Sequence, residues 1–97
     1  VRERVAQARA AAAHRWQPVG VRTNAEVPGP VLRRAFRLSR DAMEPLRRAL
    51  DRGSLSIRGV DRTLRVAWSV ADLAGKDSPT VEDVGTALSF REEGVQR

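Results

Sequence analysis

The sequence predicts an all-α fold, a single domain of 97 residues built as a small bundle of four to five helices. Three observations favour this fold class. Apolar residues recur every three or four positions in several segments, and no long stretch alternates with the two-residue period of a strand. Gly and Pro separate these segments. Hydrophobic residues make up 41% of the chain, which is enough for one core of modest size.

The first helix is predicted from Val1 to about Trp16, because this segment is rich in Ala and Arg and lacks both Gly and Pro. Its inner face is expected to carry Val1, Val5, Ala8 and Ala12. Residues 17–30 contain three Pro and two Gly. This composition ends the helix and predicts an irregular connection over about 17–29.

A second helix is predicted from Pro30 to about Ser39, since proline is well tolerated at a first helical position. Its apolar residues are Val31, Leu32, Ala35, Phe36 and Leu38. A third helix follows, with Ser39 as its N-cap and Gly53 as its stop. Pro45 is expected near the start of this helix or at a kink in it.

The longest helix is predicted between Ser56, as N-cap, and Gly75, just past its end. Its core face is expected to comprise Val60, Leu64, Ala67, Ala71 and Ala74, widened by Val66 and Val70. A last helix is expected to begin after Thr80, which resembles a capping box together with Asp83, and to end at Gly94. Its inward residues are expected to be Val81, Val84, Ala87 and Leu88.

Positive charge is concentrated in the first half of the chain. The formal net charge is +6, and arginine supplies 17 of the 18 basic residues. Residues 1–50 hold 11 basic and four acidic side chains, whereas residues 51–97 hold seven and eight. The basic surface, a possible site for nucleic acid, is therefore predicted at Arg33, Arg34, Arg37, Arg40, Arg47 and Arg48.

The residues that are missing exclude several classes of function. The chain has no Cys, no Tyr and a single His, so we expect no metal site and no Cys/His catalytic pair. His14 is expected to be an ordinary exposed or half-buried residue. No glycine-rich loop ends in the GK[ST] pattern that cradles a phosphate. We therefore expect no catalysis by this chain alone, and we expect a cytoplasmic protein because it has neither a membrane-span nor a signal-peptide pattern.

The predicted helix after Ser56 carries a line of polar residues opposite its apolar face, namely Arg58, Arg62, Arg65, Ser69 and Asp72. An arginine in the first turn and an aspartate near the end reverse the charge order that the helix dipole favours. Arg58 is thus not placed to stabilise its own helix, and a guanidinium beside first-turn amides suits a phosphate. The alternative is a solvated flank in which these arginines pair with Asp61 or Asp72.

The segment SLSIRGVDRTLRVAWSVADLAG, residues 54–75, resembles the C-terminal segment of the YifB/ComM proteins, which are magnesium-chelatase-like AAA+ ATPases. There the segment reads roughly L-S-x-R-x-x-x-R-x-L-R-V-A-R-T-I-A-D-L. The helix VAQARAAAAHR is similar to the family's V-x-x-A-R-x-x-Q-x-x-R, through Val5, Ala8, Arg9 and Arg15. The turn TNAEVPG and the closing helix also resemble the family, through Asn24, Ala25, Ala87, Leu88, Phe90 and Arg91.

The resemblance covers nearly the whole chain and implies that residues 1–97 form the C-terminal helical lid of a longer ring-forming ATPase. In such lids a sensor-2 arginine contacts the γ-phosphate, and Arg58 is the residue that matches the S-x-R of the motif. Arg62 and Arg65 would contact phosphate or form ion pairs between subunits. The implied partners are an N-terminal AAA+ core, the other subunits of a hexamer, and DNA. The implied cofactor is ATP with Mg²⁺, bound by the parent protein and not tightly by this domain alone.

Two residues depart from the family pattern. Trp68 stands where the pattern has Arg after Val-Ala, and Ala12 stands where the first helix has Gln. We expect Trp68 to pack at the edge of the apolar face and not to stack on a base. Two other functions stay open: a stand-alone basic helical module that binds DNA or a protein, and metal insertion into a porphyrin, which only the family's name suggests.

Overall fold

The residues that the structure describes form five α-helices and two short 3-10 helices. The structure is a computed structural model that describes residues 2–95, and the surroundings of side chains up to residue 90. The helices are α1 (Arg2–Trp16), η1 (Gln17–Val19), η2 (Asn24–Glu26), α2 (Gly29–Arg33), α3 (Arg40–Asp51), α4 (Ile57–Leu73) and α5 (Val81–Val95). The described part contains no strand, so the all-α prediction is confirmed. The predicted helix start at Val1 and the side chain of Arg91 lie outside what the structure describes.

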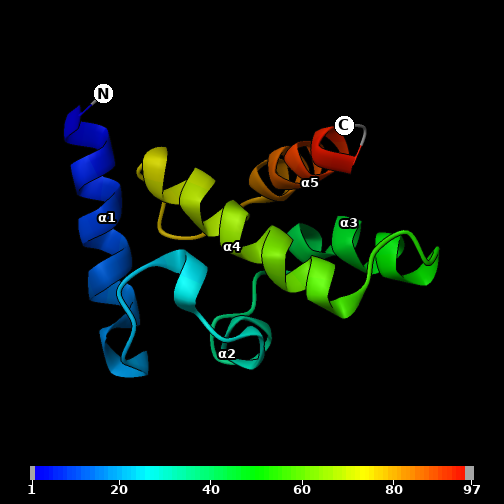
Figure 1. The fold of residues 1–97 in the computed structure, drawn as a ribbon, viewed down its shortest axis with the longest axis horizontal. Coiled ribbons are helices and arrows are strands. Elements are labelled where there is room, and N and C mark those ends of the chain that lie inside the picture. The colour runs from blue at the N-terminus through cyan, green and yellow to red at the C-terminus, as the bar shows by residue number, and fades with distance from the viewer. Residues whose placement is uncertain (1, 96–97) are drawn as a thin grey trace.

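The longest helix, α4, lies at the centre of the bundle (Figure 1). It contacts α1, α2, α3, α5 and η2. Helix α1 lies on one side of α4, whereas α3 and α5 pack against each other as well as against α4. Because every other α-helix touches α4, the side chains of α4 determine how the bundle is assembled.

Three aromatic rings organise the core beside α4. Trp16, the last residue of α1, is fully buried and meets Phe36 edge-on, with ring centroids 4.6 Å apart. Its other neighbour is Trp68 of α4, at 5.6 Å and also edge-on. Edge-to-face contacts of this kind add to the free energy gained by burying the rings. Trp68 is only 4% exposed, so it packs against apolar neighbours as predicted, but it lies within the core and not at the edge of the apolar face.

The helix ends follow the predicted capping residues. Ser39 and Ser56 each accept a hydrogen bond through Oγ from the backbone amide three residues on, at 3.2 and 3.1 Å. Gly53 and Gly75 follow α3 and α4 with φ of +75° and +73°. A residue with a Cβ rarely adopts that left-handed conformation, which is why glycine ends both helices.

The second helix is much shorter than predicted. It ends at Arg33, residues 34–36 form a turn, and residues 37–39 are irregular. The backbone amide of Phe36 donates a hydrogen bond to the carbonyl of Val31, five residues earlier, which closes a wider turn than that of an α-helix. This turn brings the Phe36 ring to Trp16. Ala35, predicted on the apolar face, is exposed. Packing of one aromatic ring therefore overrides the helical pattern of this segment.

Two predicted core faces are rotated in the structure. On α4, Val66 is 37% exposed. The buried face of the helix is rotated about the helix axis, so that Trp68 lies in the core instead. On α5, Val81 is 46% exposed because it is the first helical residue, and Asp83 is buried in its place. The carboxylate of Asp83 accepts a hydrogen bond from the amide of Thr80 at 2.9 Å, which confirms the predicted capping pair.

Candidate functional site

The arginine line on α4 begins in the first turn of that helix. Arg58 is the second residue of α4 and is exposed, and this first turn contains no acidic residue. Arg62, one turn further on, is also exposed. Neither guanidinium forms an ion pair with a carboxylate that the structure describes. The start of α4 thus combines the positive end of a helix dipole with two arginines that have no described counter-charge.

Arg65 differs from the two arginines before it. It is half-buried, and its Nε donates a hydrogen bond to the backbone carbonyl of Val27 at 3.0 Å. Val27 is fully buried in the irregular connection after η2. Arg65 therefore ties this connection to the middle of α4.

The two aspartates of α4 do not pair with arginines of the same helix. Asp61 accepts a hydrogen bond from Nε of Arg33, on α2, at 2.9 Å. The Asp61 carboxylate also lies so close to Gly29 that a Cβ there would come within 2.1 Å of its Oδ2. Asp72, predicted on a solvated flank, is buried and pairs with Arg15 of α1. The pairing within α4 that the solvated-flank alternative required is therefore wrong, because both carboxylates bind α4 to other helices.

A buried polar network joins the end of α1, η2 and the end of α4. Arg15 donates from both terminal nitrogens to Asp72, Nη1 to Oδ2 at 3.1 Å and Nη2 to Oδ1 at 2.5 Å. The side chains are only 13% and 1% exposed, respectively. The Arg15 guanidinium also lies 4.2 Å from the ring centroid of Trp68, a cation–π distance. A bidentate, desolvated pair of this kind holds its two helices in one orientation.

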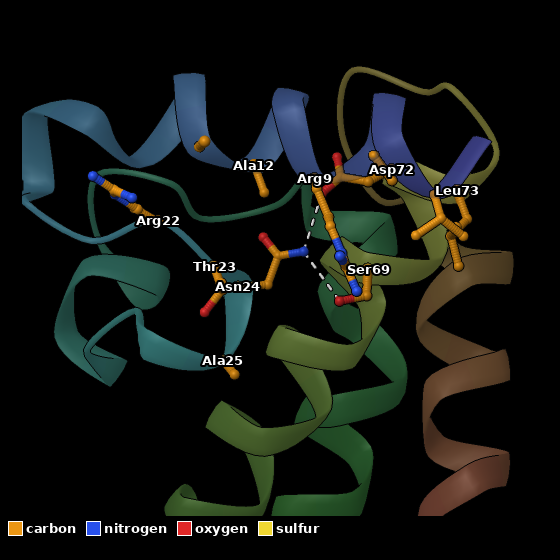
Figure 2. Close-up of a pocket in the computed structure, with 12 residues that line it drawn as sticks. Arg9, Ala12, Arg22, Thr23, Asn24, Ala25, Ser69, Asp72 and Leu73 are labelled. Atoms are coloured by element: carbon orange, nitrogen blue, oxygen red, sulfur yellow. Dashed lines mark hydrogen bonds between the residues drawn. The ribbon is translucent and has the colours of Figure 1, made fainter. Parts of the chain in front are cut away.

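Asn24 completes the network from η2. Its Nδ2 donates to Oδ2 of Asp72 and to Oγ of Ser69, both at 3.0 Å, and Figure 2 shows both bonds. Its Oδ1 accepts from Nε1 of Trp16 at 2.7 Å and from Nη1 of Arg15 at 3.4 Å. All hydrogen-bonding positions of this buried amide are thus used, which is what a buried polar group requires.

A mostly apolar pocket of about 490 Å³ lies beside this network (Figure 2). It is lined by α1, by residues 22–25 and by the end of α4. Ala8 and Ala12 supply apolar wall on α1, Leu73 supplies it on α4, and the exposed Arg9 and Arg22 also line the pocket. The pocket is therefore formed by three segments whose relative positions the Arg15–Asp72–Asn24 network fixes.

Comparison with known proteins identifies the family of this domain. Residues 1–91 match the family described as magnesium chelatase, subunit ChlI C-terminal. The chain belongs to this family. It is thus a magnesium-chelatase-like C-terminal domain of the AAA+ lid type.

The curated relatives are long proteins of mycobacteria. An uncharacterized protein of Mycobacterium bovis and uncharacterized proteins from two strains of Mycobacterium tuberculosis are each 70% identical over 97 residues. The match covers 100% of this chain but only 19% of the length of each relative. No solved structure gives a significant match.

The predicted basic surface of this magnesium-chelatase-like domain lies on α2, on the turn after it and on α3. A hollow of about 760 Å³ brings four of the six predicted arginines together, Arg33, Arg37, Arg40 and Arg47. Arg34 and Arg48 are also exposed, and all six lie on these adjoining segments. The structure thus places the six residues on neighbouring elements, separate from the Arg15–Asp72–Asn24 network.

The single histidine of this domain, His14, is exposed, as predicted. Within residues 2–95, no helix is long and apolar enough to span a membrane, and no group of three His, Asp or Glu side chains could hold a metal ion.

Sequence reasoning missed the buried network as a unit. Arg15, Asn24 and Asp72 each lie in a segment that resembles the family pattern, but they are far apart in the sequence. The sequence offered one indication of the network, namely that each of these three polar residues lies in a segment that resembles the family pattern. Nothing in the spacing of those segments shows that the three side chains meet.

Proposed function

We propose that this chain is the C-terminal lid of a longer ATPase of the ComM/YifB type, and that Arg58 is its sensor-2 arginine. The observation that supports this role is the exposed position of Arg58 in the first turn of α4, with no acidic residue in that turn. An external phosphate would supply the missing negative charge. The length of the relatives, of which this chain covers 19%, supports a parent protein with room for an ATPase core.

In this proposal the core of the parent protein holds ATP and Mg²⁺, and the lid contributes positive charge at the terminal phosphate. Phosphoryl transfer is catalysed mainly by positioning and by electrostatic stabilisation of the phosphoryl oxygens. A guanidinium on the first turn of a rigid helix is well suited to this task because it is held in place before the reaction. Movement of the lid would then couple hydrolysis to the neighbouring subunits of a ring, which we propose is a hexamer acting on DNA.

Arg62 and Arg65 have different roles in the proposal. Arg62 is exposed one turn after Arg58 and is free to reach phosphate or a carboxylate of a neighbouring subunit. Arg65 is half-buried and bonded to Val27, so we assign it chiefly to the attachment of the connection.

The test is ATP turnover by the longer protein carrying Arg58→Ala. We expect kcat to fall roughly a hundredfold, because removing one preorganised charged donor at a reacting centre costs about that much. Arg52→Ala is the matched control, since Arg52 is an exposed arginine just after α3 and lies outside the α4 line. The control should keep the original kcat. If Arg58→Ala also keeps it, Arg58 is not the sensor-2 residue.

A further inference from the structure

The surface with the highest density of positive charge lies away from the start of α4. Residues 33–48 contain six arginines and only two carboxylates. All six arginines are exposed, and four of them line the hollow between the end of α2 and the first turns of α3. The proposed ATPase role of the lid makes no use of these side chains.

Internal ion pairs neutralise only part of this charge. Arg47 and Arg48 both bond to Glu44, and Arg47 bonds also to Asp51. Arg33 is held by Asp61, as described above. The remaining three arginines form no ion pair with any carboxylate described by the structure, and these are Arg34, Arg37 and Arg40.

We propose that this surface binds the sugar–phosphate backbone of a nucleic acid. Guanidinium groups bind phosphate through two parallel hydrogen bonds, and several of them along one surface match a polyanion better than they match a single anion. The hollow is open and shared between two elements, as a backbone that runs across the surface requires.

The apolar residues of the hollow favour a nucleic acid over an acidic protein. The fully buried centre of a protein–protein interface is typically more apolar than the rest of the surface and poor in charged residues. In this hollow Leu38 is already buried in the core and Met43 is half-buried, so little exposed apolar surface is left for a protein partner. No aromatic ring lines the hollow, so the contacts would go to phosphates and would not depend on base sequence.

This inference deepens the proposal that the ring acts on DNA, because it names the surface of contact. Its test uses the 97-residue chain without ATP, and the chain encloses its own core. Failure to bind nucleic acid would therefore leave the assignment of Arg58 untouched. If Arg58 proves not to be the sensor-2 residue, the proposed binding of nucleic acid by the arginine surface is likewise unaffected.

The experiment measures binding by fluorescence anisotropy with labelled 30-nucleotide probes, one a duplex and one single-stranded oligo-dT. Affinity should fall with salt between about 50 and 200 mM, and the slope counts the phosphates contacted. We expect Arg37→Gln/Arg40→Gln to weaken binding roughly tenfold and to reduce the slope by about 2. Comparison of the two probes tells whether double or single strands are preferred, and either preference supports the inference.

The matched control is Arg2→Gln/Arg4→Gln, which removes the same charge from exposed positions on α1. The control should bind nearly as the unsubstituted chain does, and circular dichroism of both variants should show the original helix content. Equal loss in both variants would indicate unspecific attraction to net charge and would overturn the inference. Polyglutamate binding as tightly as DNA at the same salt would also overturn it, since an acidic protein would then be the partner.

Discussion

At the scale of single residues, Asp72 is the side chain on which the arrangement of α1, η2 and α4 depends. Its carboxylate is 1% exposed and is bonded to both Arg15 and Asn24. A buried charge is tolerated only when partners replace the water that it has lost. Asp72 therefore requires α1 and η2 to dock together, and neither can shift without leaving a buried polar group unpaired.

We expect Asp72→Ala to lower the free energy of unfolding by about 3 kcal/mol, because it leaves the desolvated Arg15 guanidinium without its counter-charge. Urea denaturation followed by circular dichroism measures the change. Asp51→Ala is the control: it removes a carboxylate that is 66% exposed and whose ion pair in the described part of the chain is to Arg47, so the midpoint should stay nearly constant. Equal effects of the two substitutions would show that the Arg15–Asp72 pair has no special structural role.

The roles of single residues were only partly predictable from the sequence. Ser39, Ser56 and Thr80 were found because capping depends on neighbours three residues away. The partners of Asp61 and Asp72 were not found, because Arg33 and Arg15 come from other helices. Local chemistry can be read from local sequence, but pairing between helices requires the fold.

At the scale of elements, the contact between α2 and α4 is set by a glycine. Gly29, the first residue of α2, lies directly under the carboxylate of Asp61. No side chain fits between them, since even a Cβ would come within 2.1 Å of Oδ2. This close approach lets Asp61 reach Arg33, so that one carboxylate fixes both the start and the end of the short helix.

A pair of glycine substitutions tests this contact. Gly29→Ala should destabilise the chain by more than about 1 kcal/mol, because the added methyl displaces Asp61 and breaks its bond to Arg33. Gly85→Ala should do the opposite and stabilise by up to about 1 kcal/mol, because it lies within α5 and its Cβ meets nothing within 4 Å. Thermal unfolding of both variants checks the signs. A Gly29→Ala chain as stable as the original would show that α2 can move away from α4 freely.

Helices were predicted well where the pattern was long, as in α1, or long and capped, as in α3, α4 and α5. The second helix was predicted to reach Ser39 but stops at Arg33, since the Phe36 ring is drawn to Trp16. The rotation of α4 was likewise set by a ring, that of Trp68. Large aromatic side chains in the core thus decide what a periodic pattern of small apolar residues leaves open.

At the scale of the whole molecule, the carboxylates with perturbed pKa values lie at ends and on surfaces of helices. Burial raises the pKa of Asp83, but hydrogen bonds from Thr80 and Lys76 outweigh burial and hold the pKa below its ordinary 3.8. The hydrogen bond from the Thr23 hydroxyl lowers the pKa of Glu26 below 4.5. All of these shifts favour the ionised carboxylate in the folded chain.

The pKa of Glu44 is also lowered from 4.5, chiefly by its hydrogen bond to the Arg47 guanidinium. Folded carboxylates with lowered pKa values bind protons only at more acid pH than the unfolded chain does. The free energy of unfolding therefore rises with pH through this range and is highest above the unfolded values of 3.8 and 4.5. With a net charge of +6 at pH 7, protonation of carboxylates also increases the repulsion among the arginines.

We expect the chain to lose stability as the pH falls from about 5 to 3, and Asp83→Asn to lose less over the same range. The substitution removes the titrating group, so at neutral pH it should cost about 1 kcal/mol, and this difference should shrink as the pH falls toward the lowered pKa of Asp83 and the original side chain binds a proton. Urea unfolding at fixed ionic strength in steps between about pH 7 and 3 measures both curves. Asp77→Asn, at an exposed loop carboxylate, is the matched control and should follow the original curve at every pH. Parallel curves for Asp83→Asn and the original chain would mean that the start of α5 contributes nothing to acid sensitivity, and that the loss comes from charge repulsion across the molecule.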